Sequence, residues 1–307
     1  MISPDYKMEG SRRLGAALFG VGRIGQVHLK NMVDSGRLTI RWLVDVPAQH
    51  GVMTELIGKH RLQGEAQVID IKASQKVFED PRVDVVIICT PTPFHSDIIK
   101  KALTAGKHVM CEKPLTLTVL DSKECYEVAR NHDRILFCAY NRIFLDMAIH
   151  DIDYICWLVG EKPLSVCAFG SISSDNSTLY QKFDDFDSVT AILNFPNGVM
   201  AQMEATREAN IGYEQKVEVL GTRGLIQTQN IKTSELYTVT QESCKSEPLL
   251  QTFLDRYIDS FPTELNHFID AVQGKEDILV TAESCIIAME VSEALSKSLK
   301  TKTIVQL

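Results

Sequence analysis

The chain has 307 residues, which is long for one compact core, so we expect two domains. Its net charge of -8 argues against a nucleic-acid partner, because binding to a phosphate backbone relies on concentrated Lys and Arg, and favours a small-molecule ligand. No run reaches the roughly 20 apolar residues of a membrane span, and residues 1–13 lack the apolar core of a signal peptide. The sequence therefore predicts a soluble, cytoplasmic protein with no membrane partner.

The eight cysteines form no CxxC pair. Cys89, Cys111 and Cys138 lie within apolar runs that are typical of buried strands, so reduced thiols in the core are favoured over disulfides. We expect no metal site.

The first half of the chain alternates short apolar runs with amphipathic stretches, which is typical of a parallel sheet covered by helices. The apolar runs that predict strands are 14–20, 39–46, 83–90, 108–112 and 134–140. The stretches that predict helices are 24–34, 48–59, 95–105 and 119–131. We therefore expect a doubly wound Rossmann domain over residues 1–142.

The pattern changes after about residue 143, where apolar and polar residues alternate. The runs that predict strands are 164–171, 188–195, 199–207 and 216–220, and turn signals at 196–198 and 221–224 favour antiparallel pairing. Helices are expected near 262–273 and 282–299, with Thr281 as a possible N-cap of the second. Residues 143–307 are thus predicted to form an α+β substrate and oligomerisation domain with a mainly antiparallel sheet.

A GxGxxG sequence begins at Gly20, directly after the first predicted strand and before a helix, which is the context that a dinucleotide-binding turn requires. Gly20 permits the tight turn, and Gly22 lets the backbone approach a pyrophosphate. Gly25 lets the helix pack close to the strand, and the amides of the helix start, at Arg23 and Ile24, face the anion. A glycine-rich turn without a ligand is the alternative.

Asp45 ends the second predicted strand, about 20 residues beyond Gly25. A carboxylate there accepts hydrogen bonds from ribose hydroxyls and repels a 2′-phosphate, so we expect NAD rather than NADP as the cofactor. Two observations leave alternatives open. Asp45 could cap the next helix instead. Arg23 and His50 could also accept the 2′-phosphate of NADP.

Two loops follow later strands at the same carboxyl edge of the predicted sheet, where doubly wound sheets bind their ligands. Thr90, Pro91 and Thr92 belong to a proline-rich loop that we expect to form a rigid wall for the nicotinamide half. Thr90 and Thr92 could also be plain turn and cap residues. Glu112 and Lys113 end the fifth strand.

Asp146 and His150 are spaced i,i+4, which places both on one face of a helix. Taken singly, each candidate is ambiguous. Lys113 could be a surface cation and Asp146 an acid at a helix start. His150 could be a structural histidine whose hydrogen bonds are satisfied within the protein.

Together, these segments resemble the Gfo/Idh/MocA oxidoreductase family. The similarity rests on GxGxxG, on CTPTxxH ending at His95, on GKHVxCEKP and on LDMAIHDIDYICWL, and it extends from about residue 14 to a final strand near 303–306. It is nearest to the inositol 2-dehydrogenase branch. The resemblance implies hydride transfer from a secondary alcohol of a cyclic polyol to NAD, with oxidation of myo-inositol to its 2-keto product as the expected reaction. A sugar or dihydrodiol dehydrogenase of the same family is an alternative.

The resemblance also implies roles for individual residues. His150 would accept the hydroxyl proton, which suits a base with a near-neutral pKa, and Lys113 would orient the oxygen and favour its deprotonation. Asp146 would hydrogen-bond substrate hydroxyls. His95 and Glu112 join the expected cofactor site, and Lys113 belongs to both the cofactor and the substrate site.

Tyr213 resembles a family position that lines the substrate pocket, although a core or edge aromatic is the alternative reading. Beyond the active site, an open antiparallel sheet commonly offers its face to a partner subunit, so we expect a homodimer or homotetramer.

The chain departs from the family pattern after Arg142. In relatives, a helix and a strand separate the sixth strand from the Asp/His helix, whereas here Arg142 is followed almost directly by Asp146. The second domain therefore lacks a few dozen residues at its start, including one wall of the substrate pocket. This shortening supports a third reading, a catalytically impaired isoform that binds the cofactor.

Overall fold

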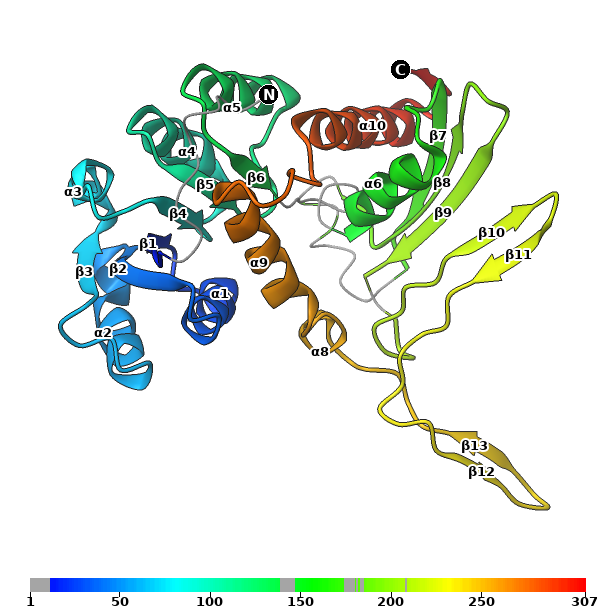
Figure 1. The fold of residues 1–307 in the computed structure, drawn as a ribbon. Helices are drawn as coiled ribbons and strands as arrows, with labels where there is room; N and C mark the ends of the chain where they lie inside the picture. The colour runs from blue at the N-terminus through cyan, green and yellow to red at the C-terminus, as the bar shows by residue number, and fades with distance from the viewer. Residues whose placement is uncertain (1–11, 139–146, 174–179, 181, 183–184, 208) are drawn as a thin grey trace. The chain divides into compact units, whose positions relative to one another are not determined.

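The computed structural model describes residues 12–138, 147–173, 180, 182, 185–207 and 209–307 (Figure 1). The chain divides into two compact units. The first combines Met1–Ala205 with Pro262–Leu307, and the second is Thr206–Phe261. Each unit is described by itself.

The first unit contains a six-stranded parallel sheet with strand order β3-β2-β1-β4-β5-β6. Its strands are β1 (Leu14–Phe19), β2 (Leu38–Asp45), β3 (Gln67–Asp70), β4 (Val85–Ile88), β5 (His108–Cys111) and β6 (Leu136–Cys138). The order reverses between β1 and β4, so the predicted doubly wound topology is confirmed. All six residues of β1 are buried and apolar, because helices cover both faces of the sheet.

Each face of this sheet has its own hydrophobic core. On one face, Phe19 and Val86 pack with Ile99 of α4 and Cys125 of α5. On the other, Leu18 packs with residues of α1, α2 and a later helix. The helices of this region are α1 (Arg23–Asp34), α2 (His50–Lys59), α3 (Gln75–Glu79), α4 (His95–Thr104) and α5 (Val119–Asn131), with short 3-10 turns at η1 (Pro47–Gln49), η2 (Ile71–Ala73) and η3 (Thr92–Phe94).

Helix α9 (Ser260–Val272) lies far along the chain yet belongs to the second of these cores. Phe268 is fully buried, and its ring lies 6.3 Å from that of Phe137 on β6. Arg37, just before β2, donates to Asn266 and pairs with Asp270 of the helix. The C-terminal segment thus completes the cover of the parallel sheet.

The rest of the first unit is built around a four-stranded sheet with strand order β14-β7-β8-β9. Its elements are α6 (Ala148–Val159), β7 (Ser165–Ser171), β8 (Ser188–Asn194), β9 (Met200–Thr206), α10 (Ala282–Thr301) and β14 (Val305–Gln306). β7 pairs antiparallel with β8 and with β14, which confirms the predicted mainly antiparallel sheet. The predicted N-cap is also confirmed, since Thr281 Oγ1 accepts from Ser284 N at 3.1 Å.

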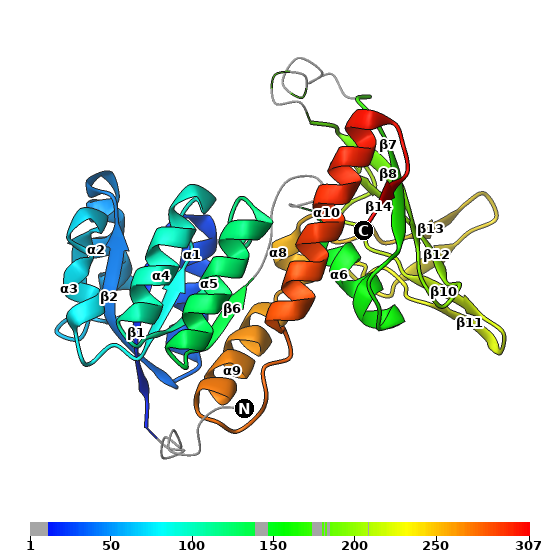
Figure 2. The same ribbon diagram turned by 90° about the horizontal axis from the view of Figure 1, so that it is seen from above.

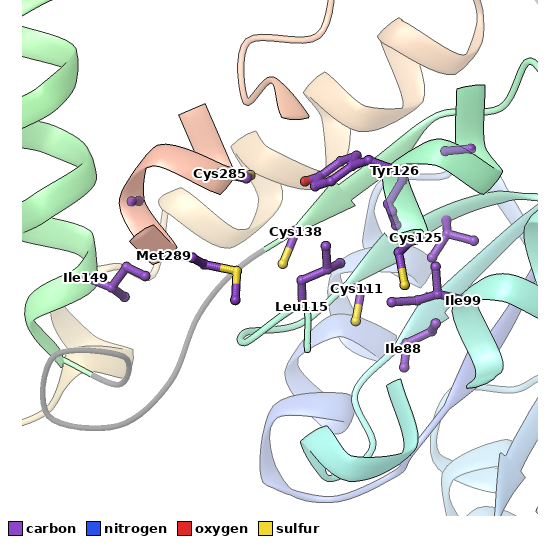
Figure 3. Packing of buried hydrophobic residues seen from close by; sticks show 14 of the residues in the cluster. Ile88, Ile99, Cys111, Leu115, Cys125, Tyr126, Cys138, Ile149, Cys285 and Met289 are labelled. Atoms are coloured by element: carbon purple, nitrogen blue, oxygen red, sulfur yellow. The ribbon is translucent and has the colours of Figure 1, made fainter. Parts of the chain in front are cut away.

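Helices α6 and α10 connect this part of the unit to the parallel sheet through one continuous core. Figure 3 shows Ile149 of α6 and Met289 of α10 beside Leu115 and Cys138. Cys285 of α10 lies near Cys138 in the same view. Figure 2 shows α10 running beside α5 and over β7, in agreement with the contacts between these elements.

The second unit contains two small antiparallel hairpins and a short helix. They are β10 (Glu218–Gly221) with β11 (Gly224–Gln227), β12 (Tyr237–Val239) with β13 (Cys244–Ser246), and α8 (Phe253–Arg256). The turn signal at 221–224 closes the first hairpin, where Gly221 is paired with Gly224. None of the described helices in either unit has the length and apolarity needed to span a membrane.

Candidate active site

The turn after β1 requires glycine at two positions for reasons of packing. Gly20 has a φ of +90°, and a Cβ there would stand 2.5 Å from Cys89 O. A Cβ at Gly25 would stand 2.0 Å from Gly20 O, so only glycine lets α1 start this close to the strand. These two glycines shape the turn.

Gly22 is different, because neither packing nor backbone conformation requires glycine there. It is the N-cap of α1 with a φ of -65°, and a Cβ at this position meets no atom within 4 Å. The first amides of a helix favour an anion, and a glycine at the turn lets that anion contact the backbone. The turn therefore fits the pyrophosphate of a dinucleotide.

Asp45, at the end of β2, is tied to this turn. Its Oδ2 accepts from Val21 N at 2.7 Å, and its Oδ1 accepts from Val46 N at 2.7 Å. A carboxylate can accept about four hydrogen bonds, so both oxygens can still accept from a ribose. The structure thus gives Asp45 a second task, which is to hold the glycine turn against β2.

The loop after β4 carries a buried hydroxyl that is not satisfied within the described residues. Thr90 is 9% exposed, and its Oγ1 is buried without a hydrogen-bond partner. Pro91 is exposed, and Thr92 begins η3. An unsatisfied hydroxyl beside a glycine turn is compatible with a polar ligand group.

Glu112 and Lys113 follow β5 at the same edge of the sheet, and Lys113 is half-buried. His28 Nε2, on α1, donates to Glu112 Oε1 at 2.7 Å, while Glu112 Oε2 accepts from Lys113 N at 3.0 Å. Burial raises the pKa of Glu112, but the hydrogen bond and charge of His28 outweigh it and leave the pKa below its usual value. For His28, burial lowers the pKa, but Glu112 outweighs that effect and raises it. Both shifts favour a charged pair.

Glu264 of α9 lies in the electrostatic field of this pair. Burial, followed by the charge of Glu112, raises the pKa of Glu264 to about 7. Sequence reasoning missed His28 and Glu264, because each lies on an amphipathic helix and resembles an ordinary polar position. The available signal was that His28 lies on the buried face of α1, next to Leu29.

His95 is almost fully buried at the first position of α4. Its Nδ1 lies 2.7 Å from Pro114 O, and its Nε2 lies 2.6 Å from Thr90 O. The side chain therefore joins the loop after β4 to the loop after β5. Its direct contact with a cofactor stays a prediction.

The helix expected to carry the acid and base is described from Met147 onward. His150 lies in the first turn of α6 and is exposed, while Ala148, Ile149 and Ile152 are buried on the opposite side of the helix. Asp146 lies outside the described residues, so its predicted spacing with His150 on one helix face stays untested.

Tyr213 lies in the second unit, within a group of aromatic side chains. Its ring centroid is 5.9 Å from that of Tyr257 and 6.5 Å from that of Phe253. Tyr213 N also donates to Leu250 O at 2.8 Å. This packing suits the alternative of a core aromatic, and the substrate role stays a prediction.

Two family models match consecutive parts of the chain. Residues 14–140 match the NAD-binding Rossmann domain of the Gfo/Idh/MocA oxidoreductases, and residues 143–307 match the C-terminal alpha/beta domain of the same family. The two matches meet near the point where β6 ends.

Individual relatives agree with these matches. The myo-inositol 2-dehydrogenase of Thermotoga maritima is 29% identical over 335 positions, covering 94% of this chain and 97% of the relative. The scyllo-inositol 2-dehydrogenase (NAD(+)) of Bacillus subtilis is 27% identical, covering 95% of each. A solved structure of a probable dehydrogenase from Thermotoga maritima has a TM-score of 0.87 at 28% identity, covering 95% of this chain and 98% of that one. The first alignment is longer than the 307 residues of this chain, so relatives carry residues that it lacks.

Proposed function

Because the chain belongs to the Gfo/Idh/MocA oxidoreductase family, we propose that it oxidises a secondary alcohol of a cyclic polyol and passes the hydride to NAD. The observation that carries the proposal is the open backbone at Gly22, which lies on the same edge of the sheet as Lys113. The glycine turn proposed for the cofactor and the Lys113 cation thus lie at the sheet edge where doubly wound sheets bind their ligands. Residues 1–142 would hold the cofactor, and residues 143–307 would supply substrate and subunit contacts.

The cofactor would be held by the turn and the two loops. Gly20, Gly22 and Gly25 shape the turn, and the amides of Arg23 and Ile24 would face the pyrophosphate. Asp45 would accept hydrogen bonds from the ribose hydroxyls, which favours NAD over NADP. The residues expected along the nicotinamide half are Thr90, Pro91, Thr92, His95, Glu112 and Lys113.

The remaining chemistry belongs to side chains of this chain. A bound nicotinamide would supply the hydride acceptor for oxidation of the carbinol carbon. The Lys113 ammonium would orient the substrate hydroxyl and stabilise the negative charge that develops on its oxygen. His150 would take the hydroxyl proton, Asp146 would hydrogen-bond neighbouring hydroxyls, and Tyr213 would line the pocket.

The proposed substrate is myo-inositol, with the 2-keto compound as product. Support comes from the relatives at 27% and 29% identity, which are a scyllo-inositol and a myo-inositol 2-dehydrogenase, respectively. Other sugars and dihydrodiols remain the competing substrates within the family. We also propose a cytoplasmic location and a homodimer or homotetramer.

The direct test is NADH formation with NAD and a panel of inositols, sugars and dihydrodiols. We expect turnover on myo-inositol that is abolished in Lys113→Ala and in His150→Ala. The matched controls are Lys101→Ala on α4, half of whose side chain is exposed, and His132→Ala after α5. Both controls should retain the wild-type rate.

The same experiment separates the competing readings. Turnover on another polyol or sugar changes the substrate and keeps the enzyme class. NADH binding without turnover on any member of the panel contradicts the dehydrogenase proposal and favours the impaired isoform, which the shortened segment after Arg142 suggests.

A further inference from the structure

Two buried histidines lie on either side of the segment that carries Lys113. His28 belongs to α1, the helix that starts at the glycine turn, and is 0% exposed. His95 begins α4 and is 1% exposed. Both are hydrogen-bonded to groups next to Lys113, one through Glu112 and the other through Pro114.

The first connection passes through the carboxylate of Glu112. One oxygen accepts from His28 Nε2 at 2.7 Å, and the other accepts from Lys113 N at 3.0 Å. The carboxylate therefore links α1 to the main chain of Lys113. A shift of α1 relative to β5 would break one of these two bonds.

The second connection passes through the ring of His95. Its Nδ1 lies 2.7 Å from Pro114 O and its Nε2 lies 2.6 Å from Thr90 O. Carbonyl oxygens only accept, so the ring donates its N–H to the main chain. The ring therefore holds the main chain after Lys113 close to the loop after β4.

Cys111 adds a contact on the same side. Its Sγ lies 3.2 Å from His95 Nδ1 and also 3.2 Å from Glu112 O, to which it donates.

We propose that the His28–Glu112 pair and the buried ring of His95 form a two-sided clamp on the main chain of Lys113, which positions its ammonium for hydride transfer. The role of Lys113 rests on the proposed function, whereas the clamp itself rests on the hydrogen bonds alone. His28, Glu112 and His95 act here as positioning residues through their contacts with the main chain.

The ring hydrogen bonds are tested by NMR on protein labelled with 15N in the histidine rings. We expect His28 and His95 each to show a ring N–H signal that exchanges slowly with water, because these hydrogen bonds are buried, and the signals are assigned by their loss in His28→Gln and His95→Gln. His108, at the opposite end of β5, is the internal reference, because its Nδ1 accepts from Ile135 N and burial lowers its pKa to about 3. Absence of a slowly exchanging ring N–H of His95 in the wild type would overturn the clamp.

The positioning role is tested by kinetics on the holoenzyme. Glu112→Ala removes both bonds and should lower kcat about 10- to 100-fold, which is a larger change than the accompanying rise in the KM for NAD. Glu112→Gln keeps an oxygen for Lys113 N and should recover a large part of the lost kcat. His108→Gln is the matched control, which should lower the melting temperature and leave kcat unchanged.

The two tests separate failure of the clamp from failure of the proposed function. If Glu112→Ala loses thermal stability but keeps kcat, Glu112 is merely structural and the clamp is wrong. If no polyol is turned over, the proposed function fails, and the clamp is then decided by the ring signals. These signals are read from the wild-type protein, so a variant that does not fold leaves them intact.

Discussion

The glycines of the turn after β1 differ in what surrounds them, and this difference separates folding from cofactor binding. A Cβ at Gly25 would stand 2.0 Å from Gly20 O, whereas one at Gly22 meets nothing within 4 Å. We expect Gly25→Ala to lower the free energy of unfolding by about 1 to 3 kcal/mol, because α1 must move away from the turn. Gly22→Ala should change it by less than about 1 kcal/mol. The same variant should weaken NAD binding about 10- to 100-fold, because its methyl group occupies the place of the pyrophosphate.

Urea denaturation and titration of NADH fluorescence measure these two effects. Gly51→Ala is the control, because Gly51 is also open but lies in α2. It should gain about 0.5 to 1 kcal/mol of stability and bind NADH normally. Wild-type NADH affinity in Gly22→Ala would show that the turn does not hold the pyrophosphate.

Asp45 combines an observed contact with Val21 and a proposed contact with the ribose, and different substitutions can separate them. Asp45→Asn keeps an oxygen for Val21 N and removes the charge, so we expect the ratio of NADP to NAD affinity to rise about tenfold, equivalent to 1.4 kcal/mol. Asp45→Ala also removes the acceptor of a buried amide and should cost about 1 to 3 kcal/mol of stability. Binding titrations with both cofactors, beside denaturation curves, measure these effects. An unchanged cofactor ratio in Asp45→Asn contradicts the ribose role.

Glu264 makes stability depend on pH in a direction that can be calculated. Its pKa is about 7 in the folded protein, against 4.5 as the ordinary value. Between these values the folded state holds a proton that the unfolded state has released, so stability falls as pH rises from 4.5 to 7 and then stays level. Glu264→Gln removes this effect. The free energy of unfolding of the variant minus that of the wild type should therefore be about 2 to 3 kcal/mol larger at pH 8 than at pH 4.5.

Urea denaturation at pH 4.5, 6 and 8 tests this prediction, with Glu55→Gln, at an exposed position of α2, as the control. The control should follow the wild type at each pH. If the free energies of unfolding of Glu264→Gln and the wild type changed equally with pH, the Glu264 carboxyl would ionise like an exposed one.

At the scale of elements, α9 shows how a distant segment completes the parallel sheet. Phe268 is 0% exposed and packs with residues of that sheet. We expect Phe268→Ala to cost about 3 to 5 kcal/mol, because a large cavity opens between helix and sheet. Leu120→Ala on α5, where the leucine is 68% exposed, should cost less than about 0.5 kcal/mol. Denaturation curves measure both losses in the free energy of unfolding. Equal losses in Phe268→Ala and Leu120→Ala would mean that α9 does not contribute to this core.

The elements that the sequence predicted are those with strong local patterns. β1 and α10 have long apolar or amphipathic stretches, and the doubly wound order follows from alternating strands and helices. The half-exposed β3 and the exposed β11 carry no such pattern, because neither has a buried face. The packing of α9 on the parallel sheet depends on contacts distant in sequence, which periodicity does not contain.

The same distinction applies to the candidate site. The glycine turn and the EKP segment were found because each is a continuous motif with its own chemistry. His28, Glu112 and Glu264 come from α1, β5 and α9, and only the fold brings their charges together. The tie between Asp45 and Val21 was missed for the same reason.

At the scale of the whole molecule, the open face of the four-stranded sheet bears on the predicted oligomer. Its inner face buries Val166 and Ala191, while Phe169 is 66% exposed and Ile192 is 44% exposed on the outer face. Met200 on β9 is 71% exposed. An apolar face of this kind favours contact with a second copy, because water then leaves both surfaces at once.

We expect Phe169→Glu to convert the homo-oligomer to a smaller species. In a two-fold interface each copy contributes the same residue, so one substitution places two charges in the contact and the penalty is doubled. Light scattering after size-exclusion chromatography measures the mass, and Leu120→Glu, at an exposed position of α5, is the control that should keep the wild-type mass. The wild-type mass in Phe169→Glu would place the interface elsewhere, and a monomeric wild type would contradict the oligomer itself. If Phe169→Glu melts at a temperature close to that of the control, its subunit is folded, and its smaller mass reflects the lost interface.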